Sequence, residues 1–141
     1  SLADAPFSRH STHYRLLAHI NEVAEAGLML ADFAYSHWPD EWTKKLDRQE
    51  LLQILLLHDL DKYLLLSDES LEMSIAHGTL SAMILNDLGF DSRVIEAVAS
   101  HSPSASLHLD DPASMILHYC DLFSCDHIYM LVSRTPHYCM K

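Results

Sequence analysis

The strongest chemical signal in this sequence is a histidine beside an aspartate at the end of an apolar run. Residues 55–57 are all leucine, His58 and Asp59 follow, and Asp61 and Lys62 add two more charges. Burying His or Asp is costly unless the side chain is paired, hydrogen-bonded or bound to a metal. Helical neighbours point about 100° apart, so both reach one point only if the helix ends there and the backbone turns around an ion. The alternative is a helix end in solvent, where the helix dipole favours His58.

Further candidate donors are dispersed along the chain, which holds 11 histidines. His19 lies in an apolar helical stripe and is either a core histidine or a ligand, with His13 as its rival for the inward position. Asp121 lies among apolar residues, either exposed or turned inward to a cation. Six side chains form one candidate ligand set of nitrogen and oxygen donors: His19, His58, Asp59, His77, His101 and Asp121. Such a set without thiolate suits one or two divalent ions of Mn, Fe, Co, Ni or Zn.

Helical segments must position these donors, and apolar periodicity predicts where they lie. The first helix is expected over residues 10–36 and carries His19. The second is expected over residues 48–58, and its leucine-rich later turns make it the most buried. Asp47 serves as its N-cap, with Glu50 three positions on as a capping box.

Two of the candidate histidines belong to the next two predicted helices. A helix over residues 70–86 is expected to contain His77, with Gly89 as its C-cap. Another helix follows Asp91 and ends at His101. A loop opens there, which is a suitable place for a ligand.

The last predicted helix carries Asp121 and starts at Asp111, a cap residue followed by proline at the first helical position. Its apolar face is expected to consist of Met115, Ile116, Tyr119, Leu122 and Phe123. The remaining segments are predicted as connections: residues 37–42, 62–70 and 102–111, and a frayed tail after residue 136.

Composition predicts one all-α domain over residues 1–141. The 141 residues are 49% hydrophobic and include only 3 Gly and 5 Pro, which favours helices. The formal net charge of −11 opposes binding to nucleic acid polymers and to anionic membranes. No apolar run approaches the ~20 residues of a membrane span. The three cysteines, Cys120, Cys125 and Cys139, show no pairing pattern, so reduced thiols and a cytoplasmic location are expected.

The six candidate ligands, taken in order, resemble the HD-domain superfamily of metal-dependent phosphohydrolases. The family pattern is H…HD…D, and its binuclear branch adds two histidines before the final aspartate. Here the match is His19, His58, Asp59, His77, His101 and Asp121. Lys62 stands where the family often has the lysine of His-Asp-x-Gly-Lys, while Asp61 replaces the glycine. The resemblance covers about residues 13–125 and implies a compact HD-domain bundle of about five to seven helices around a metal site.

The resemblance implies an enzyme that cleaves a phosphate ester or phosphoanhydride of a small molecule, a nucleotide first of all, with a metal-activated hydroxide. A binuclear centre is favoured: His19, His58, Asp59 and Asp121 hold one metal, and Asp59 bridges to a second held by His77 and His101. Asp59 and Lys62 are the expected catalytic residues, with Lys62 contacting phosphate. Asp61 either orients a ligand histidine or lies in solvent. A homodimer is compatible with this interpretation.

Two other functions remain open at this point. The same ligand set occurs in HD-type di-iron oxygenases that cleave C–C or C–P bonds, and some HD-like domains are non-catalytic signalling modules. Within the hydrolases, the short spacing after His58 looks most like the branch that splits dinucleoside tetraphosphates. That branch tends to have threonine where Ser102 stands, and residues 103–109 contain no Lys or Arg. Specificity is expected to come from Trp38, Trp42, the 102–111 loop or a partner.

Overall fold

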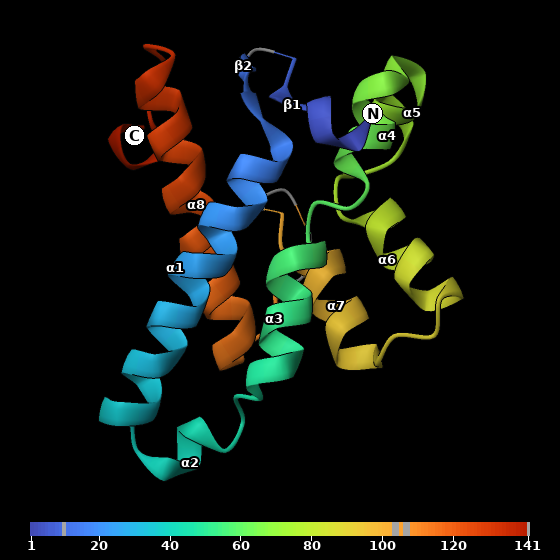
Figure 1. Cartoon of the computed structure of the whole chain (residues 1–141). Coiled ribbons are helices and arrows are strands. Elements are labelled where there is room, and N and C mark those ends of the chain that lie inside the picture. The colour runs from blue at the N-terminus through green and yellow to red at the C-terminus, as the bar shows by residue number, and fades with distance from the viewer. Residues whose placement is uncertain (10, 103–104, 106–107, 141) are drawn as a thin grey trace.

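The protein folds as an all-α bundle, as the sequence predicts, in a computed structural model that describes residues 1–9, 11–102, 105 and 108–140. Its two longest helices, α1 (Leu16–His37) and α8 (Pro112–Leu131), pack against each other (Figure 1). Helix α3 (Arg48–Leu57) packs on α1, α7 (Ser92–Ser100) packs on α3, and α6 (Thr79–Asp87) packs on α7. Every helix that the sequence assigns to a candidate donor is therefore joined to its neighbours through one core.

The core is apolar and lies where these helices meet. Its fully buried members come from helices distant in sequence: Val23, Ala31, Leu51, Ile54, Leu55, Leu85, Val94, Val98, Ile116 and Leu117. The Asp47 carboxylate caps α3 by accepting the Glu50 N–H at 2.8 Å. The Asp111 carboxylate caps α8 in the same way through the Ser114 N–H at 3.0 Å. Both predicted helix starts are therefore confirmed.

The first helix begins at Leu16, later than the predicted residue 10. A short 3-10 helix, η1 (Leu2–Asp4), leads into an antiparallel hairpin of β1 (Pro6–Ser8) and β2 (Ser11–Arg15). The Leu16 N–H then donates to the Ala5 carbonyl at 2.9 Å. Residues 11–14 are serine, threonine, histidine and tyrosine, all weak helix formers, so pairing with β1 is the better use of their backbone groups.

Three segments predicted as connections or as frayed chain contain short helices. These are α2 (Asp40–Thr43), α4 (Lys62–Ser67) and the 3-10 helix η2 (His137–Cys139). The loop predictions were wrong for these segments, and in α4 and η2 tertiary contacts stabilise the turns. Leu65 of α4 is 4% exposed, and η2 is attached through the Asp126 carboxylate, which accepts the His137 N–H at 2.5 Å.

The predicted helix over residues 70–86 is interrupted. Helix α5 (Glu69–Ser74) ends before His77, and α6 starts after Gly78, which has φ +94°. His77 therefore lies in a turn and not inside a helix. Glycine tolerates this backbone conformation, which periodicity alone does not reveal. The C-cap of α6 is Leu88 and not Gly89 as predicted, but the glycine does end the helix: it follows at C′ with φ +82°, its N–H donates to Asn86 O, and the Phe90 N–H donates to Leu85 O.

Gly78→Ala is expected to destabilise the protein more than Gly89→Ala. Both positions have positive φ, which costs an alanine about 1–2 kcal/mol. A Cβ on Gly78 would also lie 2.9 Å from the backbone oxygen of Val98, whereas a Cβ on Gly89 meets no atom of the described residues within 4 Å. In urea unfolding, the free energy of unfolding of Gly78→Ala should be about 1–3 kcal/mol lower than that of its matched control, Gly89→Ala. An equal loss of unfolding free energy in the two variants would contradict the close approach of the turn at Gly78 to α7.

The apolar face predicted for the last helix was largely wrong. Of its five members only Ile116 is buried, while Met115, Tyr119 and Phe123 are 42–63% exposed. Helix α8 instead turns a face with several small side chains toward α1, and that buried face includes Ala113, Ile116, Leu117, Cys120, Ser124 and Ile128. Small residues permit close helix packing, and Met115, Tyr119 and Phe123 are left on the outer surface.

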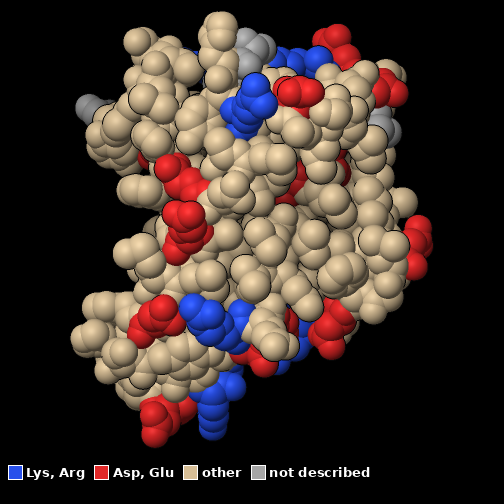
Figure 2. Space-filling view, in the orientation of Figure 1, with Lys and Arg blue, Asp and Glu red and all other residues tan. Residues whose placement is uncertain are grey.

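The surface is acidic but mixed in charge. Figure 2 shows acidic side chains (red) spread over one face, with basic ones (blue) near its upper and lower ends. Within the described residues, no helix combines the length and apolar character needed to span a bilayer. The three cysteines are free thiols, as the sequence predicts.

Candidate metal centre

The backbone turns at His58, as the adjacent histidine and aspartate require if they are to face one point. Helix α3 ends at Leu57, and His58 is its C-cap. The Leu60 N–H donates to Leu57 O at 3.2 Å, and the Lys62 N–H donates to Asp59 O at 3.0 Å. His58 is 0% and Asp59 is 2% exposed. The alternative of a helix end in solvent is therefore wrong.

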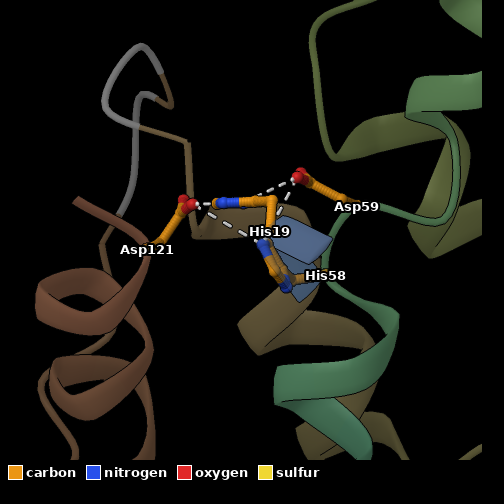
Figure 3. A group of neighbouring side chains, drawn as sticks. All are labelled: His19, His58, Asp59 and Asp121. Carbon is orange, nitrogen blue, oxygen red and sulfur yellow. Dashed lines mark ion pairs between the residues drawn. The ribbon is translucent and has the colours of Figure 1, made fainter. Parts of the chain in front are cut away.

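Four of the candidate ligands form one group between α1, α3 and α8 (Figure 3). His19 Nε2 lies 3.2 Å from Asp59 Oδ2 and 3.1 Å from Asp121 Oδ1. His58 Nε2 lies 3.4 Å and 3.6 Å from the same two oxygens. One donor atom from each residue lies within 4.8 Å of all the others. Asp121 is thus turned inward, and His19, not the exposed His13, is the inward histidine of the first helix.

A second group contains Asp59, His77 and His101. His77 Nε2 lies 2.8 Å from Asp59 Oδ1, and His101 Nε2 lies 3.6 Å from the same oxygen. The two histidine Nε2 atoms are 3.1 Å apart. The two oxygens of Asp59 therefore face different groups: Oδ2 faces the first and Oδ1 faces the second.

In all four histidines of these groups, Nδ1 contacts an oxygen atom of the protein outside the group. His58 Nδ1 donates to Leu55 O at 2.8 Å, and His101 Nδ1 donates to Val98 O at 2.6 Å. A carbonyl oxygen can only accept, so Nδ1 carries the proton in both rings and Nε2 is left for a ligand. Such outer hydrogen bonds are typical of metal-binding histidines.

In the other two histidines, the oxygen atom beside Nδ1 belongs to a side chain. His19 Nδ1 shares a hydrogen bond of 2.9 Å with Ser124 Oγ. His77 Nδ1 lies 3.2 Å from Asp61 Oδ1. Asp61 is fully buried and its Oδ2 accepts the Gly78 N–H at 3.0 Å. The alternative that Asp61 lies in solvent is therefore wrong, and its carboxylate holds His77 in place.

The donor atoms fit a divalent cation. His19 Nε2 and His58 Nε2 are buried and make no hydrogen bond within the described residues, although carboxylate oxygens lie 3.1–3.6 Å away. Buried polar atoms without partners are rare and call for an explanation such as an ion. Imidazole nitrogens and carboxylate oxygens without thiolate match ions of the Mn, Fe, Co, Ni and Zn series.

Without a metal, the pKa values of the histidines and aspartates in the centre depend on one another. Burial lowers the pKa of His58, but Asp59 and Asp121 together raise it to about 9. Burial lowers the pKa of His77, and hydrogen bonds to Asp59 and Asp61 raise it to about 10. Burial raises the pKa of Asp59, but His58 and Lys62 hold it well below its usual range. The metal-free centre is therefore a network of imidazolium and carboxylate groups.

Metal-free protein should lose stability as pH rises from about 7 toward 10. The histidines have an ordinary pKa of 6.5 when unfolded, and in the folded state His58 and His77 have values of about 9 and about 10. A raised folded pKa stabilises the protein fully below the unfolded value, and this stability is lost as pH rises through the folded value. Urea unfolding of chelator-treated protein measures this trend. A free energy of unfolding that rises with pH over this window would contradict it.

Lys62 lies beside the centre. Its Nζ is 3.8 Å from Asp59 Oδ2 and 3.7 Å from the ring centroid of Phe7, and its side chain is 19% exposed. The Phe7 ring packs edge-on against His19, with 4.8 Å between centroids. The hairpin that replaces the start of the predicted first helix thus covers the centre and positions its lysine.

Sequence reasoning missed two supporting residues on α8. Ser124 holds His19, and the Cys125 Sγ donates to Asp121 Oδ1 at 3.6 Å. Burial and the nearby Asp121 raise the pKa of the Cys125 thiol, so it remains a donor. Both residues follow Asp121 by about one helical turn, which places them on the same side of α8. That spacing is the signal that could have identified them.

A third supporting residue, Ser81 on α6, was missed as well. Its Oγ accepts the Asp61 N–H at 2.7 Å, and its side chain is fully buried. Serine is usually exposed in proteins, and its contact with Asp61 spans 20 positions of sequence. Nothing in the local sequence therefore indicates that Ser81 reaches the centre.

A family model described as the HD domain matches residues 16–125. The match runs from the first residue of α1 to Cys125 on α8 and contains all six candidate ligands. The comparisons with curated proteins and with solved structures found no match.

Proposed function

Because the chain belongs to the HD-domain family, we propose that it is a metal-dependent phosphohydrolase with a binuclear centre. The observation that carries this proposal is the pair of donor groups that share Asp59, with four ligands in one group and three in the other. We expect a phosphate ester or phosphoanhydride of a small molecule as substrate, with nucleotides as the first class to test.

The chain's own residues would prepare the centre for this reaction. Two divalent ions bound there would neutralise charge on a phosphate and activate water as the nucleophile. Asp59 would contribute one oxygen to each group, and the Nδ1 hydrogen bonds of His58 and His101 keep the Nε2 atoms of these two rings available. Phe7 and the hairpin cover His19, which limits access of water from that side.

The size and charge of a small hollow, about 180 Å³ in volume, favour a phosphate as the reacting group. It is lined by His77 together with the cationic side chains of Lys62 and Arg9. His77 is the most exposed of the ligands, with 32% of its side chain accessible. A hollow of this size suits a phosphoryl group better than a whole nucleotide, and its two cations would attract the phosphate oxygens.

The test is metal analysis of protein purified without chelator, followed by a phosphatase panel with Mn, Co, Ni and Fe(II). The panel is run with and without oxygen. About two metals per chain and phosphate release that needs no oxygen would support the proposal. Two irons with turnover only in oxygen would favour the oxygenase, and a protein without metal would overturn the ligand assignment.

Lys62→Gln should lower kcat/KM for phosphate substrates by about 10- to 150-fold, because a hydrogen bond to a charged group contributes about 1.5–3 kcal/mol. Its metal content should stay unchanged, since Lys62 donates no ligand. Steady-state kinetics on metal-loaded protein measures the effect. Lys44→Gln is the matched control, because Lys44 is exposed and should tolerate the same change. Equal kinetics for both variants would remove Lys62 from the proposed site.

A further inference from the structure

A second, larger cavity lies between the end of α1, α2, α7 and the start of α8. Its volume is about 760 Å³, within the range of roughly 300–1,000 Å³ typical of small-molecule sites. Aromatic and imidazole rings line much of it: Trp38, Trp42, His101, His108, His118 and Tyr119. Among the described residues, it shares His101 with the metal centre but none with the hollow beside Lys62.

The described part of the cavity lining has acidic side chains without basic ones to balance them. Asp110 and Asp111 contribute carboxylates, and none of the described lining residues is Lys or Arg. The Asp111 carboxylate is fixed, since it accepts the Ser114 N–H at 3.0 Å and the Ser114 hydroxyl at 3.1 Å. An anionic ligand would be repelled here, and the chain's formal net charge of −11 adds to that repulsion.

The rings are available for contact with a ligand. Tyr119 is 60% and Trp42 is 45% exposed, although large aromatic side chains usually bury most of their surface. The Lys45 ammonium already lies 4.5 Å from the Trp42 ring centroid, at a distance typical of cation–π contacts. Lys45 does not line the cavity, and its contact is an example of a cation beside the Trp42 ring in this chain.

We propose that this cavity binds a small organic cation of the alkylammonium type, held between the aromatic rings and the carboxylates of Asp110 and Asp111. A ring face attracts an ammonium group electrostatically, and the attraction is strongest for tryptophan. A nucleobase could stack on the same rings and donate hydrogen bonds to a carboxylate, but it carries no positive charge for the two carboxylates to neutralise. The proposal does not depend on the reaction at the metal centre.

Intrinsic fluorescence tests this site directly, because Trp38 and Trp42 are the chain's two tryptophans. Choline chloride is titrated into chelator-treated wild-type protein, with its uncharged isostere dimethylbutanol as the matched ligand and sodium chloride as the ionic control. Choline should give a saturable change and bind at least about fivefold more tightly than the isostere. Saturation-transfer NMR of the choline methyl groups provides a second readout that does not rely on tryptophan.

Variants locate the binding. Tyr119→Leu and Asp110→Asn should each weaken choline binding about fivefold, while Tyr138→Leu, which changes an exposed tyrosine outside the cavity, should leave it unchanged. Unfolding in urea verifies that the variants fold. Equal affinity for choline and dimethylbutanol, or saturation by adenosine without any choline signal in either readout, would overturn the proposal.

Discussion

Asp59→Asn is expected to lower the proposed phosphohydrolase activity by roughly a thousandfold and to reduce the metal content below that of the wild type. Among the described residues, Asp59 is the one common to both donor groups, with Oδ2 facing the first and Oδ1 facing the second. Asparagine replaces one of these oxygens by an amide NH₂, which donates and cannot bind a cation. One group therefore loses its shared carboxylate. Metal analysis and kcat/KM measured on the same samples give the result.

Asp87→Asn is the matched control, since Asp87 is exposed on α6 and should tolerate the change. Circular dichroism of both variants distinguishes a lost site from a lost fold. An Asp59→Asn protein that keeps its full metal content and activity would show that the two groups do not act through a shared carboxylate.

The residue types of the centre were predictable from the sequence because they are costly to bury alone. His58 and Asp59 follow an apolar run, and the only way for both to face one point is a helix that ends there. The structure has that turn, and it brings all six candidate ligands together. Chemical type and order along the chain, together with the family resemblance, thus selected six side chains that the structure places close together, without a correct position for every helix.

The turn that carries His77 could not be predicted from periodicity. The apolar pattern of residues 70–86 fits one helix, but Gly78 adopts φ +94° because its N–H reaches the Asp61 carboxylate and its Cα lies close to α7. Both contacts join segments that are distant in sequence. A single glycine in a helical pattern does not by itself indicate such a break.

The face of α8 was mispredicted for a related reason. Hydrophobicity favoured Tyr119 and Phe123, yet close packing against α1 selects small residues such as Ser124. Ser124 also supports His19 across 105 positions of sequence. Which partner a helix meets is a tertiary property, and it determines both the buried face and the residues that hold the ligands.

Asp61→Asn should reduce affinity for metal in the group of Asp59, His77 and His101 about 10–100-fold. Both Asp61 oxygens face donors, His77 Nδ1 on one side and the Gly78 N–H on the other. Asparagine has one oxygen, so its NH₂ must face one of these donors. If it faces His77, Nδ1 becomes the acceptor and the proton of the neutral ring moves to Nε2, the atom directed at Asp59. Metal titration and imidazole ¹⁵N NMR measure both effects.

Ser81→Ala separates this positioning role from a general loss of stability. It removes the hydroxyl that accepts the Asp61 N–H at 2.7 Å, so a buried donor is left without its partner, at a cost of about 1–3 kcal/mol. The Asp61 carboxylate still faces His77, and we expect the affinity for metal and the tautomer to stay as in the wild type. If Ser81→Ala lowers the affinity as much as Asp61→Asn does, Asp61 acts through stability alone. If only Asp61→Asn moves the proton of His77, the aspartate that replaces the family's glycine is part of what keeps Nε2 free.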